Sequence, residues 1–294
     1  MKKKKEEILL TSSQIARKKF FQNKLAVLGL IIIVIFIVLS VGAPLFTKLD
    51  PNQSDLLNIR TCPSREHLLG TDDLGRDIFT RLLYGGRISI AVGVISMLLQ
   101  LLIGVTVGTL AGYFGGLVDK VVMRIVDIIM CFPFFVIAIA LASVLGGSIT
   151  NLVLIIGMLM WPGIARIVRS QVLVIKETEF VMAAKALGLN AFEIIISHVL
   201  PNVVSSILVA STLSVASGIL MEATLSFLNL GVNPPNPSWG NMLVAAQSMS
   251  VLKNQWWMWI PAGSAVVMMV LAVNFVGDGL RDALDAKSKL CTED

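Results

Sequence analysis

Long stretches without charged residues alternate with short charged segments along this chain. The run 25–46 contains no charged residue, and its length matches the roughly 20 apolar residues that a helix needs to cross a bilayer. No small-residue cleavage site follows it, which argues against a cleaved signal peptide. The pattern therefore predicts a first membrane span in this run.

Four further apolar segments predict an all-α membrane protein with six spans. A single charge, Asp127, interrupts the longest segment, and the turn 146–148 divides that segment in two because glycine permits a tight reversal. Trp256, Trp257 and Trp259 predict an interfacial belt where the last span begins. The ranges are 88–118 for the second span, 125–165 for the third and fourth together, 203–221 for the fifth and 256–277 for the sixth.

The basic residues predict how the spans are oriented. With both termini in the cytoplasm, 17 of the 24 Lys and Arg residues lie on the cytoplasmic side, as the positive-inside rule expects. The expected division is a basic cytoplasmic tail at 1–24, the first span at 25–46, an external loop at 47–86, a core that holds the other five spans at 87–281 and a cytoplasmic tail at 282–294. Within the core, 177–200 is expected in the cytoplasm and 232–255 outside.

Composition narrows the function classes. Hydrophobic residues make up 55% of the chain and charged residues 15%, against about 25% charged residues in soluble domains. The net charge of +5 comes from basic clusters beside apolar runs, without the interleaved aromatics that nucleic-acid binding favours. The three cysteines and two histidines are too scattered for a disulfide framework or a metal site. The sequence has no phosphate-binding loop and no nucleophile–base pattern, so we expect no enzyme activity and no cofactor.

Two features inside the spans are expected to serve packing. Gly104, Gly108 and Gly112 share one face of the second span and allow another helix to approach closely; lining a pore is the alternative. Arg124 and Asp127 stand three residues apart and are expected to pair on one helical face.

Glu222 lies 19 residues beyond Val203, about 28 Å along a helix, and so near the outer boundary of the membrane. It is a candidate gate or substrate contact. The alternative is a hydrogen-bonded carboxylate at the end of the fifth span.

The segment between the fourth and fifth spans is too charged for a span and too apolar for a loose linker. Two short amphipathic helices explain it. Gly188 is suited to a left-handed stop after the first helix, Asn190 and Glu193 form a capping box for the second, and Pro201 is expected to end the second. The apolar stripes are Phe180, Ala183, Ala184 and Leu187 in the first helix, and Phe192, Ile195, Ile196 and Val199 in the second.

Helices that lie on lipid headgroups carry many basic residues on their polar face. Here only Lys176 and Lys185 stand against Glu177, Glu179 and Glu193. Docking into a groove of another protein therefore explains the segment better.

The residues Ala183-Ala184, Gly188 and Leu200-Pro201 resemble the EAA loop of bacterial ABC importer permeases. Met182 and His198 depart from the general pattern of that loop and resemble its oligopeptide/dipeptide/nickel branch. Further segments resemble the same branch, specifically the C-type permease of the pair. They are GTDDLGRDIFTRLLYGGRISI at 70–90, EATLSFLNLG at 222–231, PSWG at 237–240 and NFVGDGLRDALD at 274–285.

The resemblance implies a type I importer permease with cytoplasmic coupling helices in the bacterial cytoplasmic membrane. It implies a second, related permease subunit, two ATP-binding subunits and an external substrate-binding protein as partners, with peptides moved by alternating access. Nickel or another small solute is the alternative cargo; a secondary transporter or channel and a membrane scaffold are alternative functions. The implied contacts with the ATP-binding subunit are Glu179, Phe180, Ala183, Ala184, Lys185, Leu187, Gly188, His198, Leu200 and Pro201.

Overall fold

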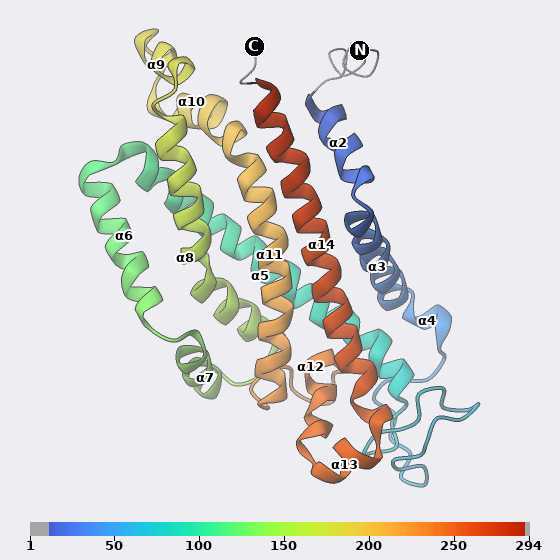
Figure 1. The fold of residues 1–294 in the computed structure, drawn as a ribbon. Helices are drawn as coiled ribbons and strands as arrows, with labels where there is room; N and C mark the ends of the chain where they lie inside the picture. The colour runs from blue at the N-terminus through green and yellow to red at the C-terminus, as the bar shows by residue number, and fades with distance from the viewer. Residues whose placement is uncertain (1–11, 292–294) are drawn as a thin grey trace, which may run out of the picture.

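The computed structural model describes residues 12–291, and these form helices and connecting loops with one isolated bridge between Thr71 and Asp77 and no strand. The helices run side by side in an elongated bundle (Figure 1). Lys2–Lys5 of the predicted basic tail lie outside the described residues. The part of that tail that is described forms a helix, α2 (Ser12–Gln22), which packs against the last helix of the bundle.

Within the described residues, five helices are long and apolar enough to span a membrane, and a bent helix pair makes a sixth span. The all-α, six-span prediction is therefore confirmed. The spans are α3 (Lys24–Val41), α5 (Ile78–Phe114), α6 (Gly116–Cys131) with α7 (Phe134–Leu145), α8 (Ile149–Ile175), α11 (Leu200–Phe227) and α14 (Ile260–Cys291).

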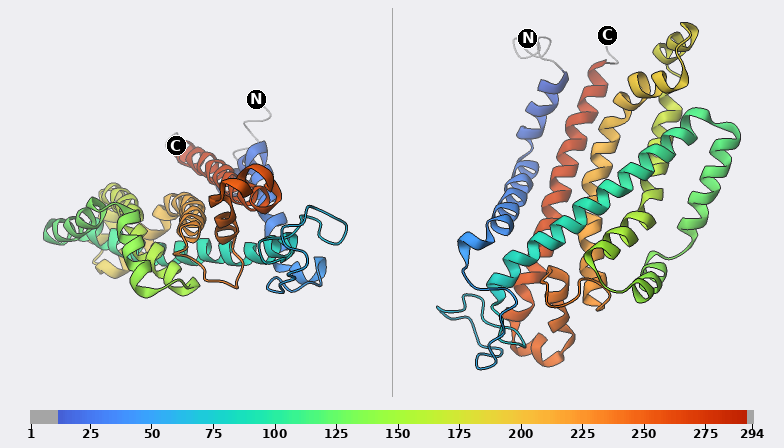
Figure 2. Two further views of the ribbon diagram at one scale, coloured as in Figure 1. Left: turned by 90° about the horizontal axis from the view of Figure 1, so that it is seen from below. Right: turned by 180° about the vertical axis from the view of Figure 1, so that it is seen from behind.

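The second span begins at Ile78, ten residues before its predicted start. Asp77 caps it by accepting a hydrogen bond from the Thr80 amide at 2.7 Å. Residues 78–86, predicted as part of the external loop, are therefore helical, and Arg81 and Arg87 donate to backbone carbonyls of neighbouring segments. The helix therefore extends beyond its apolar part, and Figure 2 shows it crossing the bundle diagonally.

The third span is broken. α6 and α7 meet at 81° around Pro133, and Phe132 has the extended backbone expected before a proline. The predicted division at 146–148 is confirmed: Gly146 follows α7 with φ +79°, and Ser148 caps α8.

The three glycines of the second span provide close packing, as expected. A Cβ added to Gly108 would lie 2.5 Å from the carbonyl oxygen of Ala165. Added carbons at Gly104 and Gly112 would lie 2.8 Å from Ile164 and Val172. All three contacts join α5 to α8, which places part of the core between these helices.

The two ends of the bundle differ. One end, here called the termini end, holds the start of α2, the end of α14 and segment 177–200 (Figures 1 and 2). The other, the loop end, holds segments 47–77 and 228–259. The loop end also contains short helices: α4 (Ala43–Phe46), α12 (Trp239–Met242), η2 (Leu243–Gln247), α13 (Met249–Asn254) and η3 (Trp256–Met258).

The predicted tryptophan belt is only partly present. Trp256 is half exposed, but Trp257 is buried against Ile78 and Met242. The belt prediction is wrong for Trp257 because the loop segments fold over the start of α14 and cover this ring.

Candidate functional site

Segment 177–200 projects from the termini end between α8 and α11. It consists of α9 (Glu179–Ala186), α10 (Ala191–Ile194) and the π-helical turn η1 (Ile195–Val199). Val181 and Ala184 of α9 are buried and pack with Ile194 and Val199. The segment is therefore anchored to the bundle by small apolar side chains.

The local turn chemistry matches the predictions. Gly188 has φ +84°, its amide donates to the carbonyl of Lys185, and the Leu189 amide donates to the carbonyl of Ala184. This pair of hydrogen bonds is typical of a helix that ends at a left-handed residue. Asn190 and Glu193 exchange hydrogen bonds of 3.0 Å with each other's amides. Both the stop and the capping box are confirmed.

The predicted helix end at Pro201 is wrong. The chain runs as one helical rod from Ala191 to Phe227, with Pro201 in the first turn of α11. In the π turn, the Leu200 amide donates to Ile195, five residues back, and the side chain of Asn202 donates to the carbonyl of His198. Proline is tolerated in the first turn of a helix, and the π turn before it joins α10 to α11 without a break.

Each predicted apolar stripe is split between two environments. Ala184, Ile195 and Val199 face the interior. The remaining stripe residues, with Met182, form an exposed apolar surface at the termini end, here called the apolar patch. It comprises Phe180, Met182, Ala183, Leu187, Phe192 and Ile196.

The other predicted contact residues surround this patch or lie beneath it. Glu179, Gly188 and Pro201 are exposed. Lys185 lies over the ring of Tyr113 at 5.5 Å, which fixes α9 against the end of α5. His198 and Leu200 are half buried.

Glu222 is fully buried near the loop end of α11. Its two carboxylate oxygens accept hydrogen bonds from Ser89 at 2.7 Å and Ser226 at 2.8 Å. Ser89 also accepts a bond from the Trp239 amide, and Ser226 from the Val232 amide. The carboxylate thus joins α5 and α11 to the loop segment; its role as a gate or substrate contact stays a prediction.

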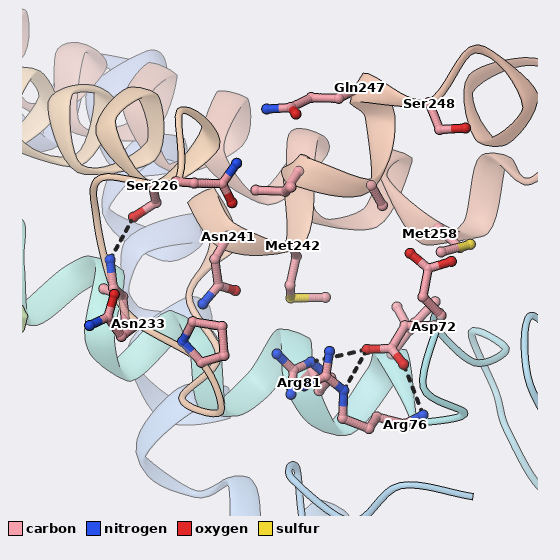
Figure 3. A pocket seen from close by; sticks show the side chains of 17 residues that line it. Asp72, Arg76, Arg81, Ser226, Asn233, Asn241, Met242, Gln247, Ser248 and Met258 are labelled. Carbon is pink, nitrogen blue, oxygen red and sulfur yellow. Dashed lines mark hydrogen bonds and ion pairs between the residues drawn. The ribbon is translucent and has the colours of Figure 1, made fainter. Parts of the chain in front are cut away.

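A cavity of about 590 Å³ opens at the loop end between α5 and segment 229–258 (Figure 3). Asp72 pairs with Arg76 at 2.8 Å and with the buried Arg81 at 3.6 Å. Arg81 also donates to the carbonyls of Pro51 and Pro235. The arginine therefore ties both loop segments to the start of α5, and the cavity presents charged, amide and thioether groups together.

The predicted pair between Arg124 and Asp127 is wrong. Asp127 accepts instead from Arg166 of α8 at 2.5 Å, and Asp119 pairs with Arg169 of the same helix. Because α6 and α8 lie side by side, opposite charges on the neighbouring helix are the nearer partners. Sequence spacing within one helix does not reveal this cross-helix arrangement, although an arginine inside the apolar run of α8 was a signal for a partner.

Comparison with known proteins places these features in one family. Residues 104–290 match the model of the binding-protein-dependent transport system inner membrane component, and residues 11–63 match the N-terminal TM domain of oligopeptide transport permease C. The oligopeptide transport system permease protein OppC of Bacillus subtilis is 44% identical over 92% of this chain and 88% of its own length.

Two further proteins extend the comparison. The dipeptide transport system permease protein DppC of Alkalihalophilus pseudofirmus is 43% identical over 93% of this chain and 90% of its own length. Among solved structures, the inward-facing MetNI methionine ABC transporter contains a chain that is similar in fold. Its TM-score is 0.58 at 19% identity, over 69% of this chain and 96% of that one.

Proposed function

Because the chain belongs to the family of binding-protein-dependent transport system inner membrane components, we propose that it is a permease subunit of an ATP-driven importer of di- and oligopeptides. Its peptide cargo is supported by relatives named as dipeptide and oligopeptide permeases. The partners in this proposal are a second permease subunit, two ATP-binding subunits and an external substrate-binding protein.

The observation that carries the proposal is the apolar patch. Phe192 is 71% exposed and Leu187 is 81% exposed, and both belong to the segment that projects from the termini end between α8 and α11. Large exposed apolar surfaces outside lipid mark sites of protein contact. In our proposal, the patch fits a groove of the ATP-binding subunit, and closure of the two ATPases moves α8 and α11 through this segment.

The proposal includes an orientation in the membrane. In it, the termini end faces the cytoplasm, which the excess of basic residues on that side supports. The loop end, with its cavity and its tethered segments, then faces outward and receives the binding protein.

Substitution of Phe192 tests the contact. In the assembled complex, Phe192→Asp places a charge in the proposed groove, and we expect it to lower ATP-dependent dipeptide uptake by about a hundredfold and to release the ATP-binding subunit during purification, because a buried unpaired charge is strongly unfavourable. Uptake of labelled dipeptide into proteoliposomes and copurification are the measurements.

Phe21→Asp is the matched control. Phe21 is also exposed, but it belongs to α2, which lies on the opposite side of the bundle from α9 (Figure 1). Full uptake by Phe192→Asp, or equal losses in both variants, would refute the proposed contact. Ala184 is less useful for this purpose because it is buried in the chain itself.

A further inference from the structure

α6 exposes two different stripes of side chains along its length. One is apolar and the other is polar, and within each stripe the residues follow at intervals of three or four, so each stripe occupies one side of the helix. The apolar stripe consists of Val118, Val121, Ile125, Ile128 and the adjoining Phe132; the polar stripe consists of Lys120, Arg124, Asp127 and Cys131.

α8 continues the polar surface across the contact between the two helices. Arg166 and Ser170 are exposed on α8, and Arg166 pairs with Asp127 of α6 at 2.5 Å. The side chains of this pair remain 48% and 52% exposed. We call this surface the charged seam: Lys120, Arg124, Asp127, Arg166 and Ser170.

The ion pair of the seam lies well inside the spans. Asp127 is about 16 Å along α6 from Gly116, and Arg166 is about 13 Å from the end of α8, at about 1.5 Å per residue. The hydrocarbon core is about 30 Å thick. Charged groups at such depth face the interior of a bundle or a water-filled cavity, because exposure to lipid is costly. The apolar stripe of α6 can face lipid, but the charged seam requires water or protein.

The charges favour water over a dry protein contact. Lys120 and Arg124 have no acidic partner within ion-pair distance among the described residues, and the seam carries three basic residues against one acidic residue. Burial without counter-charges would be strongly unfavourable for these groups, whereas water solvates them. A half-exposed ion pair can also exchange partners with a charged solute, since its net stabilisation in water is small.

We propose that the charged seam lines the water-filled translocation pathway, and that Asp127 and Arg166 contact the amino and carboxylate ends of the passing peptide. This inference rests on the proposed function for its cargo. A free peptide carries one ammonium and one carboxylate group, the two charges that this pair can bind in exchange.

Cysteine labelling in the assembled complex tests the proposal. Cys62, Cys131 and Cys291 are first replaced by serine, and single cysteines are then introduced by Arg124→Cys or Ser170→Cys in the seam. Val121→Cys and Ile128→Cys in the apolar stripe are the matched controls on α6. The probe is a charged, water-soluble methanethiosulfonate, applied to proteoliposomes opened on both sides.

We expect the seam cysteines to react at least about tenfold faster than the two controls, because the reactive thiolate forms in water and not in lipid. Added dialanine, with the binding protein and ATP present, should slow the reaction in the seam only. Equal rates in both stripes, or seam cysteines that do not react but form crosslinks with the second permease subunit, would overturn the proposal.

Peptide uptake by the cysteine-free parent distinguishes a failure of the pathway inference from a failure of the proposed function. If the parent takes up peptide while the seam cysteines stay unreactive, the inference about the pathway fails and the proposed function stands. If the seam cysteines react, but peptide is not taken up and does not slow their reaction, peptide is not the cargo. The proposed function and the peptide contact in the seam then both fail.

Discussion

Glu222 shows how a single carboxylate can be accommodated inside a membrane bundle. Each oxygen accepts a hydroxyl hydrogen bond, and the same two serines accept backbone amides from the loop end. The hydroxyl group of Ser238, also fully buried, lies beside the same carboxylate. A buried polar group is tolerated when every donor and acceptor has a partner, and here the partners come from three separate segments.

Replacement of Glu222 tests this network. Glu222→Ala leaves the donors of Ser89 and Ser226 unpaired, which costs about 1–3 kcal/mol for each group, so we expect a clearly lower thermal unfolding midpoint in detergent. Glu222→Gln keeps an acceptor oxygen, and a serine hydroxyl can rotate to accept from its amide, so a smaller loss is expected.

Thr224→Ala is the control on the same helix, because its hydroxyl is exposed and bonds only within α11. A midpoint for Glu222→Ala that equals that of Thr224→Ala would show that the network contributes nothing to stability.

The helices themselves are arranged by close contacts that glycine allows. α5 meets α8 at Gly104, Gly108 and Gly112, where a Cβ added on α5 would lie within 2.8 Å of an atom of α8. Such contacts provide van der Waals packing where apolar surface gains nothing from leaving lipid.

Gly108→Ala tests the contact between α5 and α8. The added carbon would lie 2.5 Å from the backbone oxygen of Ala165, so the helices must move apart, and we expect a destabilisation of about 1–3 kcal/mol from this overpacking. Gly263→Ala in α14 is the matched control, since its added carbon would meet only a side-chain atom of Leu243 at 3.5 Å. Chemical unfolding of the two purified variants is the measurement, and equal stabilities would contradict the packing argument.

The whole molecule is polarised between its two ends. The termini end presents the apolar patch. At the loop end, Arg81 and the hydrogen bonds around Glu222 hold the loop segments against α5 and α11. In the proposed function these two ends would contact different partners, the ATP-binding subunit at the apolar patch and the substrate-binding protein at the loop end, and the length of the spans separates them.

Thiol labelling in intact cells tests this orientation. Cys62 is exposed in segment 47–77 at the loop end. With Cys131 and Cys291 replaced by serine, we expect Cys62 to react with an impermeant maleimide added to spheroplasts. A cysteine introduced by Leu187→Cys in a Cys62→Ser background should react only after the membrane is opened. The opposite pattern would place the apolar patch outside the cell and would remove the basis for the proposed ATPase contact.

The sequence by itself determined the number of spans, the division at 146–148, and the glycine stop and capping box of segment 177–200. These features depend on neighbours along the chain: a run of apolar residues, a glycine that can adopt positive φ, and a capping box within one turn. The family resemblance also rested on short motifs of this kind.

Only the tertiary structure decided which charges meet and which apolar residues stay exposed. Arg124 and Asp127 suggested a pair within one helix, but the approach of α8 supplies Arg166 instead. Ala184 and Leu187 share one predicted stripe, yet packing against α10 and η1 buries the first and leaves the second exposed. Such choices depend on contacts between segments distant along the chain, which a helical periodicity cannot specify.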